Sequence, residues 1–259
     1  MRNLKCFMRY RGTRYHGFQR QNNANTIQAE TERALGQVLN GPVTIYGCSR
    51  TDAGVHANAY CFSCETDRPI PPLNLLRGVN GALPPDIALL SCEEVPAAFH
   101  ARYACRGKEY VYRIHNSESK NPFLTDLAYH YRRRLDPELL QHCAECFIGT
   151  HDFKSFCATD AAHINTIRTI YDFSVEIDGD SVKLLVKGDG FLYNMIRILV
   201  GTLLWVNDGL LKPEDLPAIL EARDRTRAGV TAQAHGLYLN RVFYDDSYQT
   251  EPRRGLVIK

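Results

Sequence analysis

A short polar stretch, Ser49–His56, combines a carboxylate, a guanidinium and two hydroxyls within eight residues. It lies between two apolar runs, Val43–Gly47 and Ala59–Cys64, which have the length and alternation of short strands. Loops held between strands often carry catalytic residues, so Asp52 is a candidate catalytic carboxylate. The alternative is an ordinary turn in which Asp52 hydrogen-bonds to its own backbone, and this stretch alone does not decide between the two.

A basic segment, residues 9–21, contains Arg9, Arg11, Arg14 and Arg20 interleaved with Tyr10, Tyr15, His16 and Phe18. Guanidinium groups bind phosphates and flat rings stack on unpaired bases, so this composition is typical of RNA binding. We expect Arg11 and Arg14 to contact phosphate. The equally weighted alternative is a solvated basic loop with a few packed aromatic rings. The net charge of the whole chain, +2, favours neither.

The most apolar run, Phe191–Val206, predicts a buried helix whose sole charge is Arg197. A buried guanidinium requires a partner, and Asp52 is a candidate. Tyr193 and Asn194 could share its helix face. The alternative is an arginine that reaches solvent along its own stem. The run has sixteen residues and is too short and too polar to span a membrane.

Nine scattered cysteines, with no apolar leader sequence before them, favour reduced thiols in a cytoplasmic protein. Two CxxC pairs, Cys61/Cys64 and Cys143/Cys146, raise the alternative of a four-thiolate zinc site. The first pair falls on a predicted strand, where residues three apart face opposite sides. The second falls inside a predicted helix. Buried structural thiols are therefore the preferred interpretation.

The elements that must position these residues alternate between strands and helices in both halves of the chain, which predicts an α+β fold. The expected domains are 1–105, carrying the Asp52 loop, and 106–259, carrying Tyr110 and Arg197. Strands are expected at Leu4–Tyr10, Val43–Gly47, Ala59–Thr66, Ile87–Cys92, Glu109–His115, Thr166–Ile177, Ser181–Gly188 and Leu237–Tyr244. Helices are expected at Thr26–Leu39, Leu73–Gly81, Asp136–Ile148, Phe191–Val206 and Pro213–Arg223, with loops at Asn116–Arg134 and Gly149–Asn165.

Several motifs, in order over nearly the whole chain, resemble those of the TruA family of tRNA pseudouridine synthases. The central motif is Arg50-Thr51-Asp52-Ala53-Gly54-Val55-His56. Each motif alone is weak, but the set is highly specific. The others are Tyr10-x-Gly12-x-x-Tyr15-x-Gly17-Phe18-Gln19-x-Gln21, Thr26-Ile27-Gln28, Phe99-His100-Ala101-Arg102, Asp152-Phe153-x-Ser155-Phe156, Phe191 through Met195-Ile196-Arg197 to Val200-Gly201, Asp224-Arg225-Thr226 and Gly236-Leu237-Tyr238-Leu239.

The resemblance implies two α+β halves with antiparallel sheets around a central basic cleft, and a homodimer without cofactor or metal. It implies isomerisation of uridine to pseudouridine at tRNA positions 38, 39 and 40. Asp52 would be the catalytic carboxylate and Arg197 its partner. Arg50 would help to displace the base and fill its place, Tyr110 would stack on the flipped base, and Leu237 would form an apolar wall of the pocket.

Two residues depart from the family pattern: Arg11 stands where relatives often have Asp, and Phe18 where many have Trp. Neither belongs to the catalytic set, but they leave the RNA preference open. Three alternatives remain: the same chemistry on another RNA, a non-catalytic tRNA-binding or folding module, and a zinc enzyme. The residues alone do not separate attack of Asp52 on C1′ of the ribose from proton removal at C2′.

Overall fold

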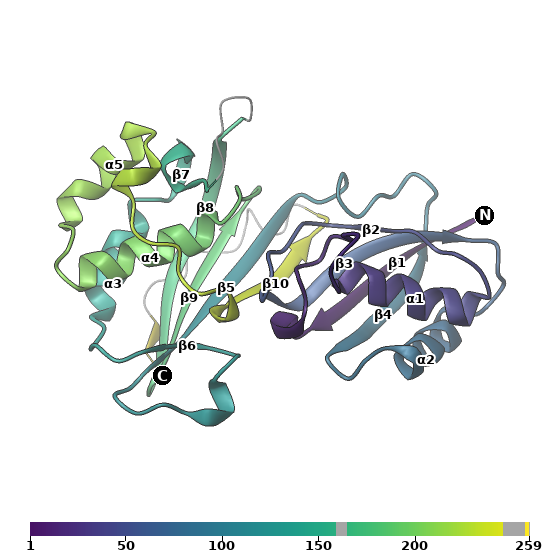
Figure 1. Ribbon diagram of the computed structural model, residues 1–259. Coiled ribbons are helices and arrows are strands. Elements are labelled where there is room, and N and C mark those ends of the chain that lie inside the picture. Colours follow the sequence, from purple (N-terminus) through teal and green to yellow (C-terminus); the bar gives the residue numbers. More distant parts are fainter. Residues whose placement is uncertain (159–164, 246–256, 259) are drawn as a thin grey trace. The chain divides into compact units, whose positions relative to one another are not determined.

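The computed structural model describes residues 1–158, 165–245 and 257–258, and the chain divides into two compact units (Figure 1). The first unit contains Met1–Arg106 together with Tyr238–Asp245. The second contains Gly107–Leu237 together with the short strand β11 (Val257–Ile258).

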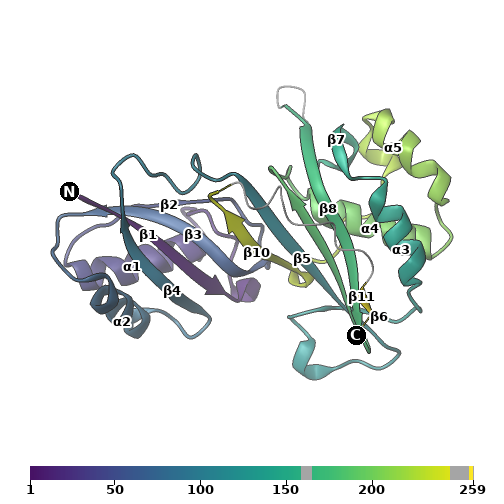
Figure 2. The ribbon, with the colours of Figure 1, turned by 180° about the vertical axis from the view of Figure 1, so that it is seen from behind.

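The first unit is a sheet covered on one face by two helices (Figures 1 and 2). β1 (Arg2–Tyr10) lies between β3 (His56–Thr66) and β4 (Ile87–Val95), antiparallel to both. β3 also pairs antiparallel with β2 (Ile45–Gly47) and parallel with β10 (Leu237–Phe243), which enters this unit at Tyr238. The helices are α1 (Ile27–Leu39), whose N-cap Thr26 accepts from the Ala29 amide, and α2 (Pro72–Ala82).

Strict alternation along β1 explains this layering. Leu4, Cys6, Met8 and Tyr10 are buried, and Met8 accepts a hydrogen bond from Thr31 of α1. Because side chains alternate across a strand, Lys5 and Phe7 point to the opposite face. There they meet the rings of Phe99 and Tyr244. The sheet is therefore covered on both faces, by helices on one and by Phe99, which follows β4, and Tyr244, which follows β10, on the other.

The second unit is a sheet covered by three helices: α3 (Pro137–Glu145), α4 (Met195–Asn207) and α5 (Leu216–Ala222). β9 (Ser181–Gly188) lies between β5 (Gly107–Asn116) and β8 (Ile167–Asp178), antiparallel to both. Parallel pairs add β6 (Tyr129–Tyr131) to β5 and β11 to β8, and β7 (Gly149–Asp152) pairs antiparallel with β8. Single 3-10 turns lie among the described residues of this unit at Pro122–Leu124, Lys154–Phe156, Pro213–Asp215, Arg225–Arg227 and Ala234–Gly236, and the first unit has one at Gly12–Arg14.

The α+β class is confirmed, with differences in detail. The expected helix Phe191–Val206 begins only at Met195, because Asn194 adopts a left-handed conformation with φ of 59°. The expected helix Pro213–Arg223 is a 3-10 turn followed by α5. Strands β6 and β7 lie inside expected loops, and part of the loop 149–165 falls outside the described residues. Both sheets also contain parallel pairs.

Two expectations about organisation stay predictions. The division into domains 1–105 and 106–259 concerns independent folding, which compactness does not test. The basic cleft concerns the arrangement of the two units.

Among the described helices, none has the length and apolar character needed to cross a membrane.

Candidate active site

Asp52 opens a tight turn between β2 and β3. The Val55 amide donates to the Asp52 carbonyl at 3.2 Å, and Gly54 has φ of 78°. A positive φ at the third residue of a four-residue turn favours glycine, which explains Gly54. Asp52 is half-buried and Arg50, two residues earlier, is exposed. The turn therefore presents a carboxylate and a guanidinium close together in the chain.

The segment 10–18 holds this turn from the side. The Phe18 amide donates to the Thr51 carbonyl at 3.1 Å, and the Gly54 amide donates to the Tyr15 carbonyl at 3.3 Å. The hydroxyls of Tyr10 and Thr51 are hydrogen-bonded at 2.8 Å. The basic segment and the Asp52 loop, predicted as separate features, thus form one interlocked structure.

Glycine is required at this interface. A Cβ on Gly12 would lie 1.9 Å from the Val55 carbonyl oxygen, and the Gly12 amide donates to Nδ1 of buried His56 at 3.0 Å. Gly17 has φ of 86°, and its Cβ would lie 2.5 Å from the Thr51 oxygen. Two backbones therefore pack in direct contact beside Asp52, where a side chain at either glycine would separate them.

The aromatic rings of the basic segment are mostly core residues. Tyr10, Tyr15 and Phe18 are all buried, and Phe18 stacks on Tyr60 with ring centroids 4.3 Å apart. These three rings support the loop and do not present a face for base stacking, so the packed-aromatic interpretation holds for them. The exposed His16 is the exception.

Arg11 and Arg14 are both exposed, and the Arg11 Nε donates to the Thr13 hydroxyl at 3.4 Å. The Arg14 guanidinium pairs with Asp86, with Nη2 and Nε at 2.8 and 2.9 Å from Oδ2. The Tyr15 hydroxyl donates to the other oxygen of Asp86 at 2.6 Å. Burial and this bond raise the pKa of Tyr15. The sequence did not reveal Asp86, which lies 72 residues from Arg14. Phosphate contact by either arginine stays a prediction.

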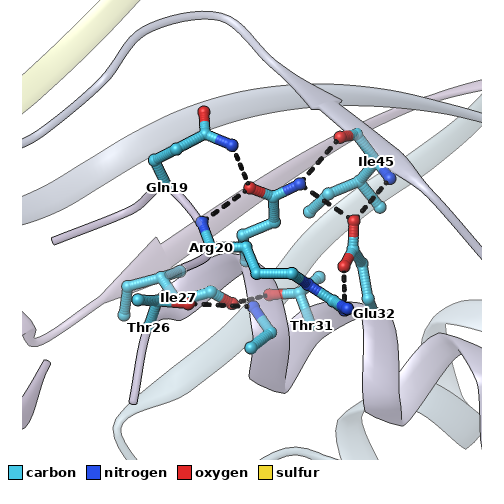
Figure 3. A network of polar contacts seen from close by, with 9 residues as sticks. Gln19, Arg20, Thr26, Ile27, Thr31, Glu32 and Ile45 are labelled. Atoms are coloured by element: carbon cyan, nitrogen blue, oxygen red, sulfur yellow. Dashed lines mark hydrogen bonds and ion pairs between the residues drawn. The ribbon is translucent and has the colours of Figure 1, made fainter. Parts of the chain in front are cut away.

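A buried carboxylate, Glu32, anchors the other end of the basic segment (Figure 3). Glu32 pairs with Arg20 and accepts from the Gln28 side chain at 2.9 Å and from the Ile45 amide at 3.0 Å. Gln28 in turn accepts from the Arg20 amide at 2.9 Å and from Gln19 at 2.8 Å. One network thus ties the segment to α1 and to the start of β2, the strand that leads to Asp52.

In the second unit, Arg197 lies in the first turn of α4 and is half-buried. Its Nε donates to the Ala232 carbonyl and its Nη1 to the Asn194 side chain, both at 2.7 Å. Asn194, in its left-handed conformation, directs its side-chain amide toward the first turn of α4. Two acceptors therefore fix the plane of the guanidinium. Tyr193, expected on the same helix face, precedes the helix and is exposed.

Tyr110 and Tyr112 lie two residues apart on β5, and both are buried. Tyr110 meets Phe191 edge-on, with centroids 5.3 Å apart. The Tyr112 hydroxyl donates to the Gln233 carbonyl at 2.8 Å, and burial raises the pKa of Tyr112 while the charge of Arg197 opposes that rise. Gly236, just before buried Leu237, packs directly on the Tyr112 ring. Tyr112 is thus the shared neighbour of the segments that carry Tyr110, Arg197 and Leu237.

The candidate residues therefore form two groups. Arg50, Asp52, Arg11 and Arg14 belong to the first unit, and Tyr110, Arg197 and Leu237 to the second. Pairing of Asp52 with Arg197 concerns residues of different units and stays a prediction.

The CxxC pairs do not share a metal-binding arrangement. Cys61 contacts Tyr244 on one face of the first sheet, whereas Cys64 contacts Cys6 on the other. All nine cysteines are free thiols, and the described ranges contain no group of three or more His, Cys, Asp or Glu residues placed to bind a metal. Burial raises the pKa of Cys61 to about 12 and that of Cys143 to about 11, as expected for structural thiols.

Comparison with known proteins covers nearly the whole chain. A family model described as tRNA pseudouridine synthase matches residues 7–104 and 143–245. A protein of Acetivibrio thermocellus named tRNA pseudouridine synthase A is 44% identical over 94% of this chain and 100% of that protein. A Clostridium perfringens protein named tRNA pseudouridine synthase A 2 is 42% identical over the same shares.

Among solved structures, a chain from the crystal structure of a Cbf5–Nop10–Gar1 complex aligns with a TM-score of 0.38 and 13% identity. The alignment covers 91% of this chain and 57% of that chain, and this likeness is too distant to support any argument. The family assignment therefore depends on the sequence matches, which include Asp52 and its turn, Arg197 and Leu237. By those matches, this chain belongs to the tRNA pseudouridine synthase family.

Proposed function

We propose that this protein isomerises uridine to pseudouridine in tRNA, at positions 38, 39 and 40 of the anticodon stem-loop, with Asp52 as the catalytic carboxylate. The observation that carries the proposal is family membership over almost the full chain, 94% at 44% identity. The rigid support of the Asp52 turn agrees with it, because catalytic groups need a fixed position.

The reaction needs neither a cofactor nor a second substrate. The bond between N1 of uracil and C1′ of the ribose breaks, the base turns, and a bond forms between C5 and C1′. C5 loses a proton and N1 gains one, so the product is an isomer of the substrate. The enzyme must extract the base from its stack, hold it while it turns, and supply one group that reacts with the sugar.

Asp52 is proposed as that group, either attacking C1′ or removing a proton from C2′. Arg197 is proposed as its partner, because an adjacent guanidinium keeps a carboxylate ionised. Arg50, exposed two residues before Asp52, would fill the space that the base leaves. Tyr110 would stack on the free uracil after tRNA binding uncovers a face of its buried ring, and buried Leu237 would close the pocket with an apolar wall.

We also propose a homodimer that acts in the cytoplasm, with Arg11 and Arg14 contacting tRNA phosphates. Nine free thiols agree with a reducing compartment. The exposure of both arginines agrees with phosphate contact.

The test is the Asp52→Asn variant, which keeps the side-chain shape and removes the charge. Unmodified tRNA carrying uridine at positions 38–40 is incubated with protein, treated with carbodiimide, and read by primer extension, which stops at pseudouridine adducts. Wild-type protein should give stops at these positions. Asp52→Asn should give none, with tRNA affinity close to wild type and a cooperative unfolding transition that shows the variant is folded.

Asp67→Asn is the matched control, because Asp67 is a highly exposed carboxylate of the same unit. It should behave as wild type. Product formation by Asp52→Asn would remove Asp52 from the catalytic role. If primer extension stops only in another RNA, that RNA is the substrate. If the wild-type protein binds tRNA but forms no pseudouridine, the protein is a non-catalytic tRNA-binding module.

A further inference from the structure

Three rings and an arginine gather on the surface of the first unit. The rings of Tyr46 and His100 lie with centroids 5.2 Å apart, and those of His100 and Tyr103 lie 4.4 Å apart. The Arg102 guanidinium lies 6.0 Å from the Tyr103 ring centre. Tyr103 is 79% exposed and Tyr46 is 48% exposed. We call Tyr46, His100, Arg102 and Tyr103 the aromatic patch.

The loop that carries the patch is anchored at several points. Asn3 donates to the Phe99 carbonyl at 2.7 Å, the Ala101 amide donates to Ser63 at 3.2 Å, and the Tyr244 hydroxyl donates to the Ala101 carbonyl at 2.8 Å. These bonds attach residues 99–101 to β1 through Asn3, to β3 through Ser63, and to Tyr244. The exposed rings therefore sit on a well-supported backbone.

His100 orders the rest of the loop. Its Nδ1 accepts from the amides of Arg102 and Tyr103, at 3.1 and 3.4 Å, and its carbonyl accepts from the Ala104 amide at 2.9 Å. The imidazole thus holds the neighbouring residues in a turn while its own ring lies between two tyrosine rings, tilted against both. Burial does not explain this arrangement, since the outermost ring gains little contact with the protein.

The charge around the aromatic patch favours a nucleic acid over a protein partner. Within the first unit, residues 95–106 contain Arg102 and Arg106 and no acidic residue. Glu93 and Glu94, which precede them, pair with Lys5 and Arg2. Tyr46 lies on β2, and exposed Arg50 follows four residues later on the loop that leads to Asp52. Flat rings beside guanidinium groups form the usual platform for unpaired bases, in which the ring stacks and the cation binds phosphate.

We propose that the aromatic patch is a stacking site for an unpaired tRNA base, with Tyr103 as the platform and Arg102 on the adjoining phosphate. The proposal rests on the proposed function and adds a binding site to it. Removal of one base from a stack exposes the faces of its neighbours, and an exposed aromatic platform compensates for that loss. The expected contribution of the site is to tRNA affinity, because base stacking and phosphate contact both stabilise the bound complex.

The experiment measures dissociation constants for unmodified tRNA in a salt series, for wild type, Tyr103→Ala, Tyr103→Phe and Arg102→Gln. Tyr103→Ala should weaken binding roughly 5- to 150-fold, the range for loss of one stacked base. Tyr103→Phe keeps the ring and should bind as wild type. Arg102→Gln should lower the slope of log affinity against log salt by about one, whereas Tyr103→Ala should leave it unchanged.

Phe123→Ala is the matched control, because Phe123 is an aromatic residue of the second unit that is 87% exposed. It should bind tRNA as wild type. Unchanged affinity in Tyr103→Ala, equal loss in Tyr103→Phe, or equal loss in Phe123→Ala would overturn the stacking site. A change of oligomeric state in Tyr103→Ala, seen by sedimentation, would assign the aromatic patch to a protein interface instead.

The two proposals fail separately. Wild-type protein that binds tRNA but leaves no pseudouridine refutes the proposed function, and the affinity of Tyr103→Ala still tests the stacking site. Wild-type protein that makes pseudouridine while Tyr103→Ala keeps full affinity refutes only the stacking site.

Discussion

Arg197 is held by two neutral acceptors of its own unit. The Ala232 carbonyl and the Asn194 side chain each bind one of its nitrogens at 2.7 Å. Hydrogen bonds of a charged group contribute about 1.5–3 kcal/mol each, so these two bonds give Arg197 a structural role whatever else it contacts. Loss of stability on its removal therefore does not by itself identify a carboxylate partner. A coupling measurement is needed.

We predict that Asp52 and Arg197 are energetically coupled. In a double-mutant cycle on urea unfolding with Asp52→Ala and Arg197→Met, the coupling should exceed about 0.5 kcal/mol, the usual limit of additivity. Arg197→Lys should be intermediate in activity, because it keeps the charge but loses the planar fork.

A parallel cycle with Asn194→Ala and Arg197→Met serves as the positive control, since those two side chains are hydrogen-bonded. Coupling in the control together with simple additivity for Asp52 would rule out the pair. Arg197 would then serve only to order the segment that contains Ala232.

At the scale of elements, close backbone packing determines where the site residues stand. The carbonyl of Val55 lies against Gly12 in the first unit, and the carbonyl of Val230 lies against Gly201 of α4 in the second. The Gly229 amide also donates to Thr202 of α4 at 2.9 Å. The segment that orients Arg197 can reach α4 only because Gly201 has no side chain.

We predict that Gly12→Ala disturbs the Asp52 turn. The new Cβ would lie 1.9 Å from the Val55 oxygen, so one of the two backbones must move. Overpacking of this kind costs about 1–3 kcal/mol, and a small displacement of a catalytic group is itself costly. The urea midpoint of unfolding and the rate of pseudouridine formation should both be lower than in the wild type. Gly41→Ala is the control, because a Cβ there meets nothing within 4 Å. Equal behaviour of the two variants would show that the turn does not depend on this contact.

Local patterns were sufficient for most elements. The strand at Leu4–Tyr10 and the helix that begins near Thr26 are predicted from a few neighbouring residues, and both are found in the structure. The start of α4 was placed too early because the run before it is apolar. Whether Asn194 enters the left-handed region depends on its tertiary surroundings, and the bond from Arg197 is one of them.

The sequence identifies the candidate site residues, but it does not identify the residues that hold them in place. Asp52 stands out by motif, whereas Asp86 becomes visible only when the fold brings it to Arg14. Burial of Tyr15 could not be inferred either, because an aromatic residue in a basic loop fits both base stacking and core packing. Interactions between residues far apart in sequence leave no local pattern.

At the scale of the whole molecule, the first unit is discontinuous in sequence. The chain leaves it after Arg106 and returns at Tyr238. In β10, Tyr238 stacks on His56 with centroids 4.5 Å apart, and Asn240 accepts from Asn58 at 2.8 Å. The Phe243 carbonyl accepts from the Arg106 amide at 2.8 Å. The strand that follows the Asp52 loop thus has a partner from far along the chain.

We predict that a fragment of residues 1–106 is less stable than the same fragment joined through a Gly/Ser linker to residues 238–245. The added strand restores the pairing with β3 and the ring contacts of Tyr238 and Tyr244. The urea midpoint of the linked fragment should be higher. A linked fragment with Tyr238→Ala and Tyr244→Ala should lose most of that gain. Equal midpoints for the short and linked fragments would show that β10 adds nothing to this unit.

The late position of β10 has a consequence for synthesis on the ribosome. Roughly 140 residues follow Arg106 before β10 is complete, which takes about 7–28 s at typical rates of translation. During that interval the residues of β3 nearest the Asp52 loop, His56 and Ala57, lack their final partner strand. An unpaired strand is a template for association with other chains. During synthesis, the nascent protein therefore exposes an edge of β3 that β10 covers in the finished enzyme, and chaperones can protect this edge.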